Sequence, residues 1–388
     1  MNNAHSRRNF LAAGLALPAA ASATRSGSGQ SQSSSPARPS SGSALQFKTL
    51  GKTGMKVTTV GMGCMITSDP SVVTRAADMG INYFDTSRNY INGQNERMVG
   101  GALGARRKNV FVASKCDRNT GADILTELDT SLKELGTDYL DVWHLHGKST
   151  PAQISDDMVA AQMKAKQQGK VRFIGVSCHG GLPAIVDRCI EAKIDVVQAQ
   201  YSFAQDASWT PAVEKLAQAG IGVIAMKVMA RAGGRGRGAQ APAAPQRPAG
   251  FGASAIRWVV KNPNVACTVP SMTDIDQLEE NFRAMSAPFN DADSKILSAR
   301  LEEIRPYYCR TCGQCDGQCP KGLPVPEMVR YVMYADGYGQ FPLGRENFQR
   351  LAQEHQQVRC GDCAQCAVQC PHGVNVAQQL SRAQELFA

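Results

Sequence analysis

Short runs of β-branched and apolar residues alternate with longer amphipathic stretches through the middle of the chain. Residues 120–135 are typical of the amphipathic kind, because their apolar side chains recur every three or four positions and so share one helix face. Strands that alternate with helices predict βα units and a parallel sheet. We predict eight strands, at residues 57–63, 82–85, 110–115, 139–145, 173–177, 196–200, 222–226 and 266–269.

Eight βα units over about 250 residues match the size of a (β/α)8 TIM barrel, so we predict an α/β fold of that type. A doubly wound sheet is the alternative. Its dinucleotide fingerprint needs a third glycine in the first βα turn, and residues 61–65 lack one. The barrel is therefore favoured. Two later amphipathic runs, 328–334 and 346–353, predict a mainly helical C-terminal domain.

The N-terminus has the layout of an export signal. Arg7 and Arg8 precede an apolar stretch, residues 11–21, that ends in small residues, which is typical of a precursor for the twin-arginine translocase. A membrane anchor is the alternative, but this stretch is too short to span about 30 Å of hydrocarbon. We expect removal of residues 1–23, a periplasmic location and no stable membrane insertion afterwards. Residues 24–44 have the composition of a disordered linker.

The net charge changes this picture little. Residues 1–23 hold two arginines and no acid, so their removal lowers the formal charge from +9 to +7. Arginines gather in a Gly/Pro-rich loop, at Arg231, Arg235, Arg237 and Arg247, and no basic helix alternates with aromatic residues. We therefore predict solvated charge and no nucleic-acid partner.

Eight of the thirteen cysteines form two copies of the spacing C-x2-C-x2-C-x3-C-P near the C-terminus. This run is typical of [4Fe–4S] proteins in which three cysteines bind one cluster and the fourth binds the partner cluster. We predict two [4Fe–4S] clusters, since neither a zinc ribbon nor a disulfide knot suits the repeated run. The ligand sets are Cys309, Cys312, Cys315 and Cys370, and Cys360, Cys363, Cys366 and Cys319. We expect the remaining five, Cys64, Cys116, Cys178, Cys189 and Cys267, to be buried thiols.

Polar residues at the carboxyl ends of barrel strands face one mouth. The predicted strand ends give Asp85 with Tyr90 five residues later, then Lys115, then His146. A neighbouring ammonium lowers the pKa of a phenol from about 10, and a carboxylate keeps that ammonium charged and in place. Each residue alone is open to a structural interpretation, such as a rim aromatic or a core histidine. Together, the carboxylate, the phenol, the ammonium and the imidazole could converge on a single mouth as a tetrad.

Several segments in the right order resemble the aldo/keto reductases: residues 50–54, 80–90, 113–115, 138–146 and 169–177. The resemblance covers roughly residues 45–286, and the tail is similar to ferredoxin-type domains fused to some members. It implies a barrel over residues 45–300 and an iron–sulfur domain over 301–388.

The same resemblance implies a reaction, in which a nicotinamide cofactor reduces a carbonyl or oxidises an alcohol. Tyr90 would be the general acid, Asp85 and Lys115 would tune it, and His146 would orient the substrate. The implied nucleotide contacts are Ser177 and Gln198 at the carboxamide, Met226 and Lys227 at the ring, and Ser271, Gln277, Glu280 and Asn281 at the adenosine end. Two acids and no cation follow Ser271, so NAD and NADP both stay open.

Two alternatives remain at this point. Departures from the family pattern at Cys178, Met226 and Ser271 fit a barrel that has become a scaffold for an electron carrier, which would dock a redox partner protein. In the other alternative the clusters are purely structural and stabilise a tail that would be only marginally stable without metal.

Overall fold

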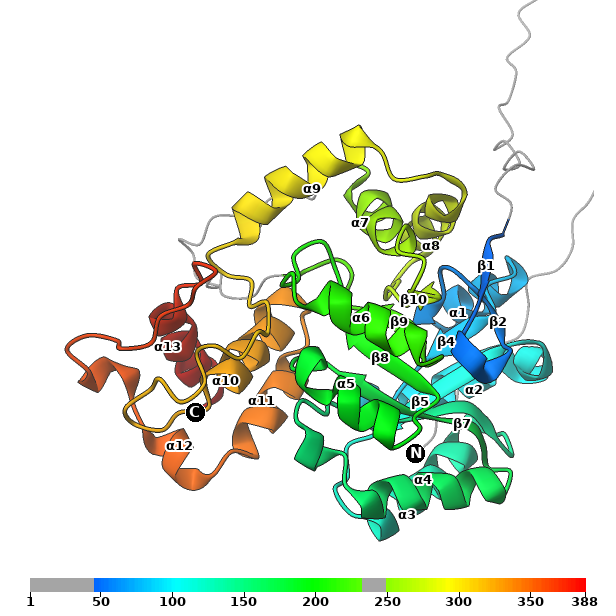
Figure 1. Cartoon of the computed structure of the whole chain (residues 1–388), viewed down its shortest axis with the longest axis horizontal. Coiled ribbons are helices and arrows are strands. Elements are labelled where there is room, and N and C mark those ends of the chain that lie inside the picture. The colour runs from blue at the N-terminus through cyan, green and yellow to red at the C-terminus, as the bar shows by residue number, and fades with distance from the viewer. Residues whose placement is uncertain (1–44, 232–248) are drawn as a thin grey trace, which may run out of the picture. The chain divides into compact units, whose positions relative to one another are not determined.

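The computed structural model of the chain describes residues 45–231 and 249–388. The predicted export signal, the predicted linker, and Arg235, Arg237 and Arg247 lie outside these residues. Eight parallel strands follow one another in sequence order from β3 to β10 (Figure 1). Their bounds are β3 (Met62–Gly63), β4 (Tyr83–Asp85), β5 (Phe111–Cys116), β6 (Leu140–Leu145), β7 (Val171–Cys178), β8 (Val196–Gln200), β9 (Gly222–Met226) and β10 (Cys267–Thr268).

The sheet closes on itself. Val60 bridges to Thr268 and Gly63 to Ser271, both in parallel, which joins the first barrel strand to the last. Closure requires close backbone approach at Gly63, where an added Cβ would lie 2.4 Å from the carbonyl oxygen of Val269. The predicted (β/α)8 barrel is therefore confirmed.

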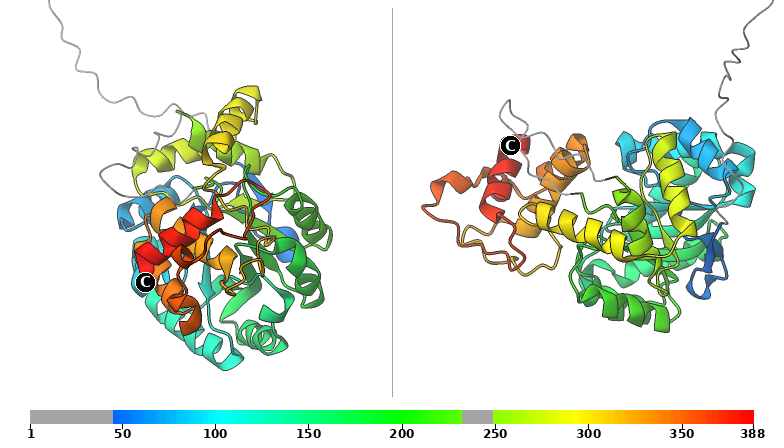
Figure 2. Two further views of the ribbon diagram at one scale, coloured as in Figure 1. Left: turned by 90° about the vertical axis from the view of Figure 1, so that its left-hand side faces the viewer. Right: turned by 90° about the horizontal axis from the view of Figure 1, so that it is seen from above.

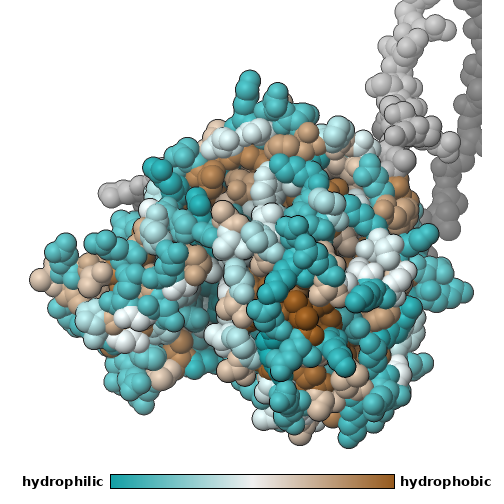
Figure 3. All heavy atoms as spheres, in the orientation of Figure 1, coloured by the Kyte–Doolittle hydropathy of each residue, from teal (hydrophilic) through white to brown (hydrophobic). Residues whose placement is uncertain are grey.

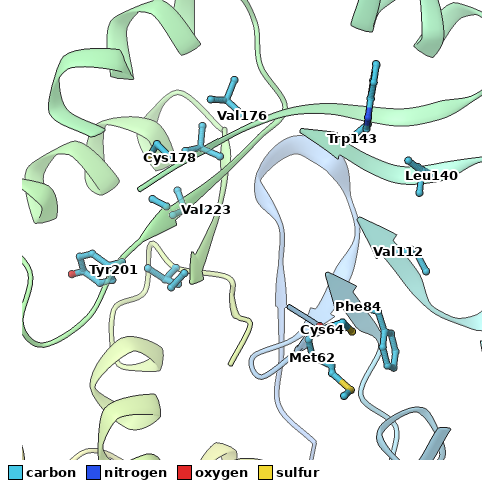
Figure 4. Close-up of a cluster of buried hydrophobic side chains, with 14 of the residues drawn as sticks. Met62, Cys64, Phe84, Val112, Leu140, Trp143, Val176, Cys178, Tyr201 and Val223 are labelled. Carbon is cyan, nitrogen blue, oxygen red and sulfur yellow. Dashed lines mark hydrogen bonds between the residues drawn. The ribbon is translucent and has the colours of Figure 1, made fainter. Parts of the chain in front are cut away.

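Eight helices follow the strands in turn: α1 (Pro70–Asp78), α2 (Asn95–Leu103), α3 (Gly121–Leu135), α4 (Asp156–Gln167), α5 (Leu182–Glu191), α6 (Trp209–Gln218), α7 (Phe251–Val260) and α8 (Ile275–Arg283). The helix predicted at residues 120–135 is α3. The Thr120 side chain caps it by accepting from the amide of Asp123, and Gly136 ends it in the left-handed conformation. Its apolar face, with Ile124 and Leu128 fully buried, joins the core between helices and sheet. Figure 4 shows other members of this core, among them Phe84, Val112 and Trp143.

Short 3-10 turns complete the barrel domain, at Gly51–Thr53, Tyr90–Gly93, Gly104–Asn109, Pro151–Gln153 and Ala284–Ser286, and another lies in the tail at Cys360–Asp362. The first predicted strand, residues 57–63, is wrong in extent. Its beginning belongs to an antiparallel hairpin of β1 (Phe47–Thr49) and β2 (Lys56–Thr58). Leu50, in the hairpin turn, packs against Gly222 at the start of β9 and belongs to the same small core as Val57 of β2, so the hairpin is joined to the barrel there.

The tail follows α9 (Asp291–Ile304), which leads from the barrel helices toward it (Figure 2). Its helices are α10 (Val325–Val332), the π-helical turn Met333–Gly337, α11 (Phe341–Gln349), α12 (Gln353–Gln357) and α13 (Val376–Phe387). The prediction at 328–334 is confirmed by α10 and the π-helical turn. The prediction at 346–353 is wrong in extent, because α11 ends at Gln349. Met328, Phe348 and Leu380 form part of one small core.

The face of the molecule in Figure 3 is mainly hydrophilic. Among the described residues, the large exposed hydrophobic side chains are Phe47, Met163 and Phe341. In this same part of the chain, every helix is too short or too polar to cross a membrane.

Candidate active site

Asp85 and Lys115 form the centre of the site at the carboxyl ends of β4 and β5. The Lys115 ammonium donates to both carboxylate oxygens of Asp85, at 2.6 and 2.7 Å, and to the carbonyl of Thr86 at 2.8 Å. Lys115 is fully buried. Burial lowers the pKa of Lys115, and Asp85 opposes that shift. The carboxylate thus fixes the position of the ammonium, as predicted.

Tyr90 begins the 3-10 turn after β4. Ile91 and Asn92, which follow it, both have positive φ, an uncommon backbone conformation that turns the chain sharply there. The Lys115 nitrogen lies 5.0 Å from the centre of the Tyr90 ring. The predicted lowering of the phenol pKa is nevertheless wrong. Burial, followed by the charge of Asp85, raises the pKa of Tyr90 well above its usual value, so the phenol remains protonated.

His146 completes the predicted tetrad just beyond β6. Its ring centre lies 6.1 Å from that of Tyr90, and its Nδ1 lies 3.3 Å from the hydroxyl of Ser87. Burial, followed by the charge of Lys115, lowers the pKa of His146 to about 3. The imidazole is therefore neutral at pH 7 and serves as a hydrogen-bonding group. The structure brings all four predicted residues together.

A wide cavity of about 350 Å³ borders Tyr90. The barrel lines it with His146, Lys148 and His179. The tail lines it with Glu327, Arg330, Tyr331, Tyr334, Asn347 and Arg350. Its volume lies in the range of small-molecule sites.

A narrow cavity of about 40 Å³ also borders Tyr90, where Gln198, Met226, Lys227 and Ser271 meet Tyr338 of the tail. The Lys227 ammonium lies 4.3 Å from the centre of the Tyr338 ring. Burial, then the charges of Lys115 and Arg231, lower the pKa of Lys227 to about 7. The space holds a few water molecules.

The polar groups of the narrow cavity suit a nicotinamide carboxamide. The Gln198 amide donates to Asp85 at 3.0 Å, while its oxygen is buried with no partner in the described residues. That oxygen matches an amide N–H of the ring substituent. The cavity of about 40 Å³ is too small for the ring, and the Tyr338 ring, whose centre lies 4.3 Å from the Lys227 ammonium, forms part of its wall. A nicotinamide ring beside Tyr90 requires Tyr338 to move.

Four of the predicted nucleotide contacts lie outside the narrow cavity. The hydroxyl of Ser177 accepts from the amide of Gly147 at 3.1 Å, at the end of β7. The other three lie on α8, where Gln277 bonds to Thr273 and Asp274 near the helix start. Glu280 and Asn281 both face Gly252 on α7. Their assignment to the adenosine end stays a prediction.

The tail is anchored to the barrel beside the first cysteine run. The Gln200 amide at the end of β8 donates to the phenol of Tyr308 at 3.1 Å, next in sequence to Cys309. The Gln205 amide donates to the carbonyl of Arg310 at 2.6 Å. His372, two residues after Cys370, lies 3.3 Å from Asp206. Cys309 and Cys370, which are predicted to bind the same cluster, thus both lie within two residues of a tail residue that contacts the barrel.

The eight cysteines of the tail are free and partly buried. Cys319, Cys360, Cys363 and Cys366 line one cavity of about 160 Å³, which is the predicted second ligand set. Burial raises the pKa of Cys309 to about 12, with Cys315, Cys370 and Cys312 adding to the shift, so the first predicted set also lies together. In the described residues no three His, Cys, Asp or Glu side chains converge on a single metal ion. Thiols spaced around a cavity fit a larger iron–sulfur group.

The five cysteines of the barrel are all buried and free, as predicted: Cys64, Cys116, Cys178, Cys189 and Cys267. The tail residues at the barrel mouth, above all Arg330, Tyr334 and Tyr338, were not predicted from the sequence. Tyr331, Tyr334 and Tyr338 recur at three- and four-residue steps, which was an available signal for one aromatic helix face.

Comparisons with known proteins agree with both parts of the chain. The model of the aldo/keto reductase family matches residues 68–249, and that of the 4Fe-4S dicluster domain matches residues 308–375. L-galactose dehydrogenase of Arabidopsis thaliana is 29% identical over 285 residues, which are 62% of this chain and 88% of that protein. L-glyceraldehyde 3-phosphate reductase of Escherichia coli strain K12 is 23% identical over 315 residues, 64% of this chain and 90% of that protein.

The fold has solved counterparts. The holo form of aldo-keto reductase AKR11C1 from Bacillus halodurans superposes with a TM-score of 0.55 at 22% identity, over 70% of this chain and 99% of that one. The thermostable aldo-keto reductase Tm1743 gives a TM-score of 0.53 at 23% identity, over 66% of this chain and 99% of that one. These likenesses support the barrel as a fold.

Proposed function

The chain carries an aldo/keto reductase domain and, C-terminal to it, a 4Fe-4S dicluster domain, and from this premise we propose that it interconverts a carbonyl and an alcohol at Tyr90. The observation that supports this most is the buried ion pair of Asp85 and Lys115 beneath a protonated phenol. Reduction of a carbonyl adds two electrons and two protons. Tyr90 gives one proton to the carbonyl oxygen, and the wide cavity offers that carbonyl a place beside it.

The surrounding residues position this proton transfer. Lys115 keeps a positive charge near the phenol, which stabilises the oxygen anion that Tyr90 becomes after it donates. Asp85 holds Lys115 in place with two hydrogen bonds. His146, neutral because of its low pKa, orients the carbonyl oxygen without competing as an acid.

We propose two kinds of redox group. Two [4Fe–4S] clusters would be held by Cys309, Cys312, Cys315 and Cys370, and by Cys319, Cys360, Cys363 and Cys366. Such clusters exchange single electrons, and the first set adjoins the barrel contacts of Tyr308 and His372. A nicotinamide nucleotide, NAD or NADP, is the proposed hydride source, and its entry depends on the movement of Tyr338.

A second candidate is an electron carrier with the barrel as scaffold. The closed narrow cavity favours it, because an electron carrier has no need of a nicotinamide ring. We further propose that the protein works in the periplasm after export by the twin-arginine route and exchanges electrons there with a partner protein. The arginine pair and the apolar stretch near the N-terminus support this location.

The test uses protein purified and kept without air, with a panel of aldehydes and ketones and with NADH, NADPH or reduced methyl viologen as reductant. Tyr90→Phe is expected to lower turnover by about 10²- to 10⁴-fold, because it removes the proton donor. Iron and sulfide content and the EPR signal of the reduced clusters should stay unchanged.

Tyr139→Phe is the matched control. It also removes a tyrosine hydroxyl, but Tyr139 precedes the start of β6, whereas the site lies at the end of that strand, so turnover should not change. Wild-type protein that is redox-active but reduces no carbonyl would favour the electron carrier. Equal turnover of wild type and Tyr90→Phe would remove Tyr90 from the mechanism.

A further inference from the structure

The wide cavity combines the proposed catalytic phenol with a cation from the tail. Arg330 lies on α10, four residues before Tyr334, whose ring centre lies 6.0 Å from that of His179. The ring centre of His179 lies 6.3 Å from that of His146, whose own ring centre lies 6.1 Å from that of Tyr90. The arginine therefore lines the same space as the reacting groups, at the wall that the tail provides.

The Arg330 guanidinium is not neutralised by a close carboxylate. No carboxylate of the described residues lies within ion-pair distance of it, and its Nε is buried without a hydrogen-bond partner there. Glu327, one helical turn earlier, is the nearby acid. Tyr331 takes up one guanidinium donor through a side-chain hydrogen bond, and its ring centre lies 5.7 Å from the guanidinium carbon. The donors that remain, Nε among them, match the oxygens of a carboxylate or phosphate.

The other charged groups of the wide cavity leave a positive excess. Lys148, Arg330 and Arg350 face Asp117 and Glu327 across it. Arg350 is paired with Asp117 at 3.0 Å. The two histidines add no charge at pH 7, because burial lowers the pKa of both His146 and His179. The positive charges of Lys148 and Arg330 are thus balanced by only one negative charge of the cavity lining, that of Glu327.

The remaining lining suits hydroxyl groups. The amide side chains of Asn89, Asn119, Gln153 and Asn347 all border the wide cavity. The oxygens of Asn89, Asn119 and Gln153 already accept hydrogen bonds within the protein, so these amides offer mainly N–H donors. Asn347 donates to the carbonyl of Leu343 and offers its oxygen as an acceptor. Together they can bond to the hydroxyls of a polyhydroxylated chain. The aliphatic side chains that line the wide cavity are few: Met65, Leu343 and Leu351.

Resting on the proposed function, we propose that the wide cavity binds a polyhydroxylated carbonyl or alcohol compound that carries an acid group, and that Arg330 of the tail binds this acid group. Its carbonyl or hydroxyl carbon then lies toward Tyr90 and His146. The tail in this arrangement contributes substrate specificity in addition to its cysteines. Arg330 is a specificity-determining residue and takes no part in the proton transfer.

The test measures binding by calorimetry on the air-free, cluster-containing protein, with glucuronate, glucose 6-phosphate and glucose as probes. Glucuronate and the phosphate separate a carboxylate from a phosphate preference, and glucose reports the hydroxyl contribution alone. Arg330→Met keeps the apolar stem and removes the charge. We expect it to weaken binding of the preferred anion by about 10-fold or more and binding of glucose by less than about 2-fold.

Arg345→Met, at an exposed arginine of α11, is the matched control and should change neither affinity. Arg330→Lys should restore part of the anion preference, since it restores the charge without the fork of donors. An equal loss for glucose and for the anion would overturn the inference, as would wild-type protein that binds no anionic probe more tightly than glucose. Because binding is measured without turnover, a protein that shows the expected affinities but reduces no carbonyl would contradict the proposed reaction alone.

Discussion

The wide and the narrow cavity that border Tyr90, its wide side and its narrow side below, differ in size and in lining. The wide side holds about 350 Å³ and is bordered by amides, histidines and cations. The narrow side holds about 40 Å³ and is bordered by Met226, Lys227 and Tyr338. One phenol therefore faces a space that fits a small polar molecule and a space that fits only water. Access to the narrow side is the property that separates a nicotinamide-dependent enzyme from an electron carrier.

The tail contributes to both sides but in opposite ways. On the wide side α10 and α11 add charged and polar groups to the wall and leave it open. On the narrow side Tyr338, just after the π-helical turn, fills the space against Lys227. The extra residue in a π-helical turn shifts the side chains that follow, and such turns often occur at functional sites. The same segment thus builds one cavity and closes the other.

The largest effect is expected from opening the narrow side. Tyr338→Ala removes the ring above Lys227 and should tighten binding of NADH or NADPH by about 10-fold or more, because the nucleotide no longer has to displace a packed side chain. Fluorescence titration of the reduced nucleotide on air-free protein measures this.

Tyr338→Phe is the control for that change, since it keeps the ring and should bind nucleotide like wild type. Glucuronate affinity on the wide side should be the same in all three proteins. If neither wild type nor Tyr338→Ala binds a nicotinamide nucleotide, the narrow side is not a cofactor site.

A smaller effect, on the thermal stability, is expected from removing the Lys227 ammonium next to the Tyr338 ring. The pKa of Lys227 is about 7 in the folded protein, against about 10.5 when exposed. The folded state therefore loses this proton near pH 7, while the unfolded state keeps it up to about pH 10. The loss of folding stability caused by Lys227 is thus greatest below pH 7 and becomes smaller as the pH rises toward 10. Lys227→Met should be more stable than wild type at pH 6, by roughly 2 °C or more in Tm, with a smaller gain at pH 9.

Thermal unfolding of both proteins at the two pH values gives this difference, and other titrating groups cancel because they are shared. Lys133→Met, at an exposed lysine of α3, should show no such dependence. A stability gain that grows between pH 6 and pH 9 would show that Lys227 is not the strained cation of the narrow side.

The smallest effect is expected at the rim of the wide side. Arg350 pairs with Asp117 at 3.0 Å and with Glu346 at 2.6 Å, and about half of its side chain is exposed. Arg350→Ala should cost less than about 1 kcal/mol of stability, as is usual for exposed ion pairs. It should weaken glucuronate binding by about 2-fold, since Asp117 then faces the cavity unpaired. A loss larger than that of Arg330→Met would make Arg350 the anion-binding residue instead.

Much of the barrel was predictable because its signals are local. Each β-branched run became a strand within a few residues, and the amphipathic stretch at α3 formed with its predicted face buried. The tetrad was predictable for the same reason, because parallel strands bring their carboxyl ends to one mouth. The first predicted strand was wrong in extent because its first residues pair with Phe47–Thr49 in the hairpin β1–β2, whose turn residue Leu50 contacts Gly222, far away in sequence.

The pKa of Tyr90 shows where sequence reasoning stops. A lysine, a carboxylate and a tyrosine can be named from their spacing, but the direction of the shift depends on how far water is excluded from the phenol. Burial under Tyr334 and Tyr338 was not visible in the order of residues, and it reverses the expected direction. Arg330 was missed for a related reason, because a cation on a helix becomes part of a site only through the surface that it faces.

By itself, the sequence determined the βα order, the phenol with its lysine and carboxylate, and two cysteine runs spaced for iron–sulfur clusters. These features depend on periodicity and short spacings, which the chain fixes before it folds. Only the tertiary structure decided that the tail covers the barrel mouth, filling one side of Tyr90 and lining the other. That outcome depends on packing between segments more than a hundred residues apart, such as Lys227 with Tyr338 and Gln200 with Tyr308, and no local pattern specifies such contacts.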